Sequence, residues 1–196
     1  MVELFCIVGK KFSGKSLVSY YLRKNFIPVI NLEEMYKSIF LPGTNCYKIL
    51  INHIGEDIID LNGHININKL SLLICKEIWI RELIDEILSN EFISITKKFK
   101  NVLVSYNIPF GGVESNLVTK NEFDNFDFLI NVNSSIENRK CRMINSNIPK
   151  IIVDKILQKE SIYDYNLSRY KINNNSSINE LEKKCNKIIQ LLNEKK

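Results

Sequence analysis

The sequence Gly9-Lys10-Lys11-Phe12-Ser13-Gly14-Lys15-Ser16 follows the pattern Gly-x-x-x-x-Gly-Lys-Ser/Thr. The apolar run Leu4-Phe5-Cys6-Ile7-Val8 precedes it, and Leu17-Val18-Ser19-Tyr20-Tyr21-Leu22 places apolar side chains at helical intervals after it. This order predicts a buried strand, a glycine-containing turn and the start of a helix. Such a turn directs several backbone N–H groups and a helix dipole at one point, which suits a phosphate group.

The same motif assigns roles to individual side chains. Lys15 is expected to reach the β- and γ-phosphates of a nucleotide, and the Ser16 hydroxyl is expected to bind Mg²⁺. A strand–turn–helix junction without a ligand is the alternative, but a chance match is rare in a chain with 7 glycines in 196 residues. The predicted nucleotide-binding residues are Gly9, Lys10, Lys11, Phe12, Ser13, Gly14, Lys15, Ser16 and Leu17.

Composition narrows the class of protein. The chain is 45% hydrophobic and 25% charged, which is typical of one globular domain. Its net charge of +5 favours an anionic partner, although the positive charge is spread along the chain. We expect no nucleic-acid partner, because no stretch of the sequence alternates aromatic and basic residues. No signal peptide or membrane-spanning run is visible, so we expect a cytoplasmic protein that binds no membrane. The cysteines form neither a disulfide framework nor a zinc site with the histidines: Cys6, Cys46, Cys75, Cys141, Cys185, His53 and His64.

Further strands and helices alternate along the chain. We predict strands at residues 25–31, 102–106, 128–133 and 170–172, in addition to the strand before the phosphate loop. Predicted helices between them include residues 69–75, 78–98 and 178–192, and Ser134 with Glu137 forms a capping-box spacing. Residues 55–66 are predicted to form a short extended excursion closed by an Asn-Gly turn. Alternating strands and helices predict an α/β fold, a three-layer α/β/α sandwich with a parallel sheet of about five strands.

The order of these features resembles the dephospho-CoA kinases, a branch of the P-loop kinases, from about Leu4 to Ile189. In that family the loop is followed by a strand ending in Val-Ile-Asp-Ala-Asp and then by an acidic-Pro-Gly turn. This chain has Val29-Ile30-Asn31-Leu32-Glu33 and Leu41-Pro42-Gly43. The family motif Pro-Leu-Leu-Phe-Glu-Ser corresponds to Pro109-Phe110-Gly111-Gly112-Val113-Glu114-Ser115, which is one residue longer.

The resemblance implies an activity and a set of catalytic residues. The family transfers the γ-phosphoryl group of ATP, with Mg²⁺, to the ribose 3′-hydroxyl of dephospho-CoA. Lys15 and Arg142 would neutralise phosphate charge, and Arg142 matches one arginine of the family's lid, whereas later lid arginines fall near Ser146 and Tyr163 or Asn166. Asn31 and Glu33 match the two aspartates at the end of the second strand. A neutral amide cannot act as a general base, so this role would pass to Glu33.

Two other functions stay open, because Asn31 replaces the expected aspartate. One is a nucleotide-binding relative without catalysis, and the other is a different small-molecule P-loop kinase, such as a nucleoside monophosphate kinase. We predict one domain over residues 1–196, with a helical substrate-binding insertion at about 43–100 and a lid at about 139–165. The expected partner is dephospho-CoA, and the expected state is a monomer or weak homo-oligomer.

Overall fold

The computed structural model describes residues 2–115, 120–159 and 168–194. The chain divides into two compact units. The sheet unit comprises Met1–Asn31 and Lys100–Lys196, and the helical unit comprises Leu32–Phe99. The helical unit thus begins directly after the second strand. Residues 160–165 of the predicted lid, which include Tyr163, lie outside the described residues. So does Asn166.

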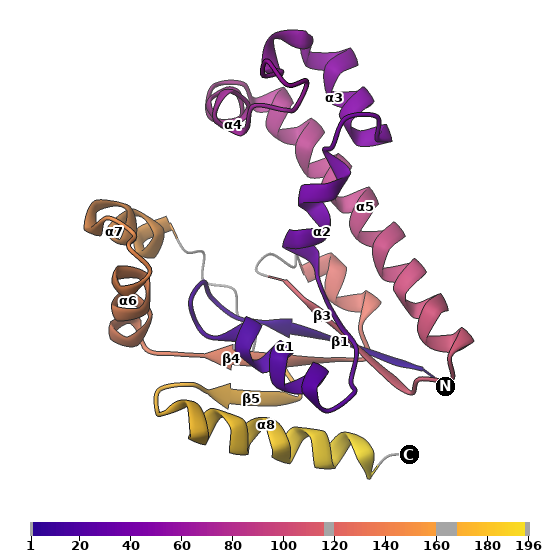
Figure 1. Ribbon diagram of the computed structural model, residues 1–196, viewed down its shortest axis with the longest axis vertical. Helices are drawn as coiled ribbons and strands as arrows, with labels where there is room; N and C mark the ends of the chain where they lie inside the picture. The colour runs from indigo at the N-terminus through magenta and orange to yellow at the C-terminus, as the bar shows by residue number, and fades with distance from the viewer. Residues whose placement is uncertain (1, 116–119, 160–167, 195–196) are drawn as a thin grey trace. The chain divides into compact units, whose positions relative to one another are not determined.

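Five parallel strands form the sheet unit, in the order β2-β3-β1-β4-β5 (Figure 1). The predicted α/β fold with a parallel sheet of about five strands is therefore confirmed. Strand β1 lies at the centre, paired with β3 on one side and β4 on the other. The strands are β1 Glu3–Val8, β2 Val29–Asn31, β3 Phe110–Glu114, β4 Phe128–Asn133 and β5 Tyr170–Asn173.

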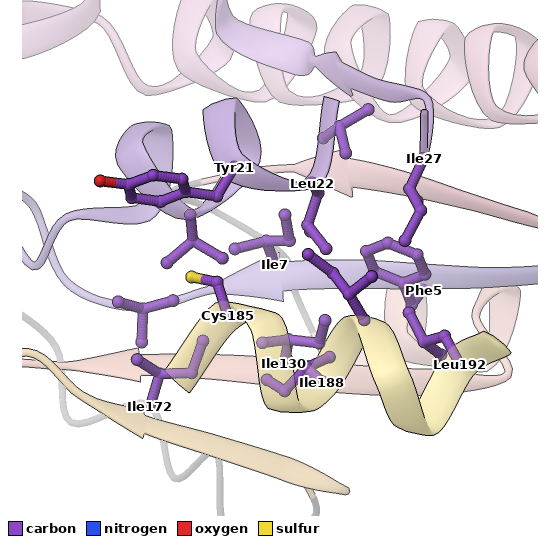
Figure 2. Packing of buried hydrophobic residues seen from close by; sticks show 14 of the residues in the cluster. Phe5, Ile7, Tyr21, Leu22, Ile27, Ile130, Ile172, Cys185, Ile188 and Leu192 are labelled. Carbon is purple, nitrogen blue, oxygen red and sulfur yellow. The ribbon is translucent and has the colours of Figure 1, made fainter. Parts of the chain in front are cut away.

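Helices α1 (Lys15–Lys24) and α8 (Ile178–Asn193) pack against one face of this sheet. Figure 2 shows Phe5 and Ile7 of β1 pointing toward side chains of both helices. The predicted apolar positions of α8 are all buried: Leu181, Cys185, Ile188, Ile189 and Leu192. On the other face, Cys6, Val8 and Leu129 form a smaller cluster with Phe123 and Phe126. Because both faces are covered, β1 is apolar from Leu4 to Val8 rather than alternating.

The helical unit has its own apolar core. It contains α2 (Leu32–Ile39), α3 (Asn45–Ile54), a 3-10 turn at Glu56–Ile58, α4 (Ile67–Lys76) and the start of α5 (Ile78–Ser105). Ile59 and Ile65 form an antiparallel bridge, and the Asp60 carboxylate accepts hydrogen bonds from the turn between them. The extended excursion predicted for residues 55–66 is therefore confirmed at this bridge, but it is wrong at Glu56–Ile58, which form the 3-10 turn. Trp79, the single tryptophan of the chain, is 47% exposed on α5.

The predicted strand at residues 102–106 is wrong, because α5 continues through it to Ser105. Phe92, Thr96 and Leu103 are buried at spacings of four and seven residues, which is the period of a helix, whereas Val102 and Val104 are exposed. The observed strand β3 begins at Phe110 and contains Gly111 and Gly112. Glycines often indicate a turn in a sequence, but here Gly112 leaves room for the ring of Phe5, its register partner on β1.

Gly112 illustrates this close packing. A Cβ atom at this position would lie 2.6 Å from Cε2 of Phe5, whose side chain is fully buried. We expect Gly112→Ala to lower the free energy of unfolding by about 1–3 kcal/mol, the usual cost of overpacking, as measured by urea denaturation. Combining Gly112→Ala with Phe5→Leu should cost less stability than the sum of the two single substitutions. A double-mutant cycle measures this difference as a coupling free energy. An unchanged urea midpoint for Gly112→Ala would contradict the close packing.

Two other elements begin later than predicted. Strand β2 is confined to Val29–Asn31, because Asn25 ends α1 and Phe26 adopts a left-handed φ of 61°, which turns the chain. Helix α6 (Ile136–Asn145) is capped by Ser135 and not by Ser134. The Ser134 hydroxyl instead donates a hydrogen bond to the carbonyl of Asn174, in the connection between β5 and α8. Helix α7 (Lys150–Lys159) follows α6.

Candidate active site

The phosphate loop connects β1 to α1, as the motif predicts. Gly9 and Gly14 have positive φ angles of 149° and 105°, and Gly14 is the N-cap of α1. A Cβ at Gly9 would lie 2.3 Å from the carbonyl oxygen of Val132. Glycine is therefore required at both positions, for backbone conformation and for close approach. The loop ends at a helix N-terminus, where the first N–H groups have no intrahelical acceptor and can bind an anion.

The Lys15 side chain folds back along this loop. Its Nζ donates hydrogen bonds to the carbonyl oxygens of Gly9, at 2.9 Å, and Lys10, at 3.2 Å. The residue is only 5% exposed, so a positive charge is held in a largely desolvated site. Both of these acceptors are neutral. The ammonium group is consequently positioned to attract the phosphates of a nucleotide, since its charge is weakly screened by water.

Ser16 contacts an acidic residue from a distant part of the chain. Its hydroxyl donates a 2.6 Å hydrogen bond to Oε1 of Glu114, the last residue of β3. Glu114 is 4% exposed. Hydroxyl and carboxylate oxygens are ligands that Mg²⁺ prefers, so the pair fits a magnesium ion beside the phosphate loop. Glu114 was not among the residues predicted for the site, because the strand that it ends was wrongly predicted at residues 102–106.

Arg142 lies against the phosphate loop from α6. Its Nη1 donates to the carbonyl oxygens of Phe12, at 3.0 Å, and Ser13, at 3.2 Å, and its Nη2 donates to that of Asn174, at 2.8 Å. Partial burial lowers the pKa of the guanidinium from its usual value. An arginine nevertheless stays charged at neutral pH. Arg142 thus adds a positive charge beside the loop while its N–H groups contact backbone oxygens.

Comparison with known proteins identifies the family. A family model described as dephospho-CoA kinase matches residues 4–180. The chain belongs to the dephospho-CoA kinase family. A dephospho-CoA kinase from Prochlorococcus marinus subsp. pastoris is 26% identical over 114 residues, which cover 53% of this chain and 55% of the relative. The first curated relatives that the chain matches are covered over only 35% to 55% of their own length.

Solved structures share the fold of this dephospho-CoA kinase family member. The crystal structure of TT1252 from Thermus thermophilus has a TM-score of 0.79 at 18% identity and covers 97% of this chain and 98% of that chain. A dephospho-CoA kinase from Campylobacter jejuni has a TM-score of 0.66 at 15% identity and covers 97% of this chain and 96% of that one. At these identities the similarity establishes the fold.

The two residues predicted to correspond to the family's strand-end aspartates lie in different units. Asn31 ends β2 in the sheet unit, and its register partner on β3 is Glu114. Paired residues on neighbouring parallel strands project to the same face, so Asn31 lies beside the Ser16–Glu114 pair. Glu33 is an exposed residue in the first turn of α2, in the helical unit. Its role as a general base stays a prediction.

The remaining predicted nucleotide-binding residues also lie on the loop and the start of α1. Lys10, Lys11 and Ser16 are exposed, and Leu17 packs partly against the core beneath α1. Ser13 is fully buried. In the part of the chain that the structure describes, no helix has the length and apolar character needed to cross a bilayer.

Proposed function

We propose that the protein transfers the γ-phosphoryl group of ATP to the ribose 3′-hydroxyl of dephospho-CoA, giving ADP and coenzyme A. The observation that carries this proposal is the buried Lys15 on a phosphate loop whose Ser16 is joined to Glu114. Phosphoryl transfer requires positioned phosphates, neutralised charge and an oriented hydroxyl, and requires little covalent chemistry from the protein. The loop supplies the first two requirements.

Each side chain has a separate part in the proposed reaction. The loop N–H groups bind the β- and γ-phosphates, and Lys15 offsets their charge. Ser16 would hold Mg²⁺, with Glu114 beside it, and the bound ion would neutralise further phosphate charge. The 3′-oxygen forms a bond to the γ-phosphorus as the bond from that phosphorus to the β-phosphate oxygen breaks. Glu33 accepts the hydroxyl proton, and the Asn31 amide orients the hydroxyl group.

The test is an assay with purified protein, ATP, Mg²⁺ and dephospho-CoA, in which ADP and coenzyme A are both quantified. We expect equal amounts of the two products. Turnover no higher than that of a Lys15→Ala control would overturn the proposal. Because the Lys15 ammonium group is held by the loop carbonyls beside the predicted phosphate site, this control is expected to remove catalysis whichever alcohol the enzyme phosphorylates.

Asn31 favours a second candidate, a nucleotide-binding protein without catalysis, because an amide cannot take a proton from the acceptor. This candidate predicts that ATP raises the unfolding temperature while no ADP forms with any acceptor. A panel of acceptors that includes nucleoside monophosphates separates the third candidate, another small-molecule kinase. Exclusive phosphorylation of dephospho-CoA would exclude both of these alternatives.

A further inference from the structure

Two arginines of α6 contact consecutive residues of the phosphate loop. Arg139 Nη1 donates a 3.3 Å hydrogen bond to the carbonyl oxygen of Lys11. Arg142 Nη1 donates to the carbonyl oxygens of the next two residues, Phe12 and Ser13. The arginines are three positions apart and therefore lie on one face of the helix. Three successive loop carbonyls are thus held by one helix.

Holding these carbonyls determines where the loop N–H groups point. A trans peptide places its carbonyl oxygen and the following N–H on opposite sides, and the described residues contain no cis peptide. The carbonyls of Lys11 and Ser13 point toward the α6 arginines, so the N–H groups of Phe12 and Gly14 point away from α6. The intervening Ser13 N–H closes a turn onto the carbonyl of Lys10. The loop therefore presents the N–H groups of Phe12 and Gly14 on the side opposite to α6.

The backbone between these contacts adopts an unfavourable conformation. Phe12 has a φ of 61°, in the left-handed region, where a residue with a side chain pays about 1–2 kcal/mol. Such a conformation persists where its surroundings hold it in place. The carbonyls on both sides of the Phe12 α-carbon, those of Lys11 and of Phe12 itself, accept hydrogen bonds from Arg139 and Arg142.

Asn174 completes the support. The side-chain Nδ2 of Asn174 donates a 2.8 Å hydrogen bond to the backbone carbonyl of Ser13. The backbone carbonyl of Asn174 accepts a hydrogen bond from Arg142 Nη2. A Cβ at Gly14 would lie 2.2 Å from Asn174 Nδ2, so the support lies directly against the loop. Arg139 is 1% exposed and Asn174 6%, which places this network in the interior of the sheet unit.

We propose that Arg139 and Arg142 are positioning residues that hold the phosphate loop in its phosphate-binding conformation before a nucleotide arrives. This inference rests on the proposed nucleotide site, and it differs from a direct contact between Arg142 and the transferred phosphate. A direct contact would affect ATP turnover and leave the empty loop unchanged. A positioning role affects the empty loop and weakens the binding of ADP and ATP to a similar extent.

The variant that tests this is Arg142→Lys, which keeps the positive charge but removes the fork of donors that reaches Phe12, Ser13 and Asn174 together. We expect the Kd for ADP to rise about tenfold, in line with the loss of hydrogen bonds that position the loop. Amide hydrogen exchange over residues 9–14 should also become faster in the nucleotide-free protein. The matched control is Lys140→Gln, which removes a charge from the same helix that is paired with Asp154 and not with the loop.

The outcomes separate this inference from the proposed function. Unchanged hydrogen exchange in nucleotide-free Arg142→Lys, or an ADP Kd within twofold of the original protein, would overturn the positioning role. An equal effect of Lys140→Gln would also overturn it, because a substitution on α6 at a residue paired with Asp154 would then match the loss of the loop contacts. Weakened ADP binding by Arg142→Lys with no coenzyme A formed by the original protein would leave the inference standing and refute the proposed function. Circular dichroism establishes that each variant is folded before binding is measured.

Discussion

Replacing Lys15 by alanine is expected to lower the rate of coenzyme A formation about 10²–10³-fold at saturating substrates, the usual cost of removing one preorganised donor from a transition state. The ammonium group is held by the carbonyls of Gly9 and Lys10 in a site that is only 5% exposed. Its charge is already desolvated before the reaction, so no reorganisation is needed as charge develops on the transferred group. Steady-state kinetics with quantified ADP measure this effect.

The control for Lys15→Ala is Lys24→Ala, at the other end of the same helix. Lys24 pairs with Glu182 on the surface, and an exposed ion pair contributes little to stability. We expect this variant to keep the original rate. A loss of less than fivefold for Lys15→Ala, in a variant with an unchanged circular dichroism spectrum, would contradict the assignment of Lys15 to the phosphates.

Replacing Glu114 by glutamine is expected to raise the Mg²⁺ concentration for half-maximal rate by about 10–100-fold, the range found for groups that support a metal ligand. Glutamine has nearly the same shape and can still accept the hydrogen bond from Ser16. The variant therefore removes the negative charge and leaves the hydroxyl partnered. Magnesium titrations of the reaction rate, at fixed ATP, provide the measurement.

Two further variants sharpen the Glu114 result. Glu114→Asp keeps the negative charge on a shorter side chain. Its Mg²⁺ concentration for half-maximal rate should therefore lie between those of the original protein and Glu114→Gln. Glu3→Gln removes an acidic group from the opposite end of the neighbouring strand, where Glu3 pairs in register with Phe110, and should leave the titration unchanged. If the Glu114→Gln titration superimposes on that of the original protein, Glu114 has no part in magnesium binding.

The errors in the predicted secondary structure have a common physical cause. The residues 102–106 are apolar and β-branched in part, yet Val102 and Val104 face solvent on the last turn of α5. The true strand contains Gly111 and Gly112, which resemble a turn in sequence, but the Phe5 ring lies against Gly112 in the folded protein. Local preference is overridden here by packing between strands that are far apart in the chain.

Local sequence determined the phosphate loop, the strand before it and the helix after it, because glycine conformation and apolar periodicity act within a few residues. It also determined β4 and α8, whose apolar residues fit a buried strand and one face of a helix. Only the tertiary structure joined Ser16 to Glu114 across 98 positions and brought the α6 arginines to the loop carbonyls. These contacts depend on the order of strands in the sheet, and periodicity carries no information about that order. The nucleotide side of the site was therefore predictable as a motif, whereas the residues that support it required the fold.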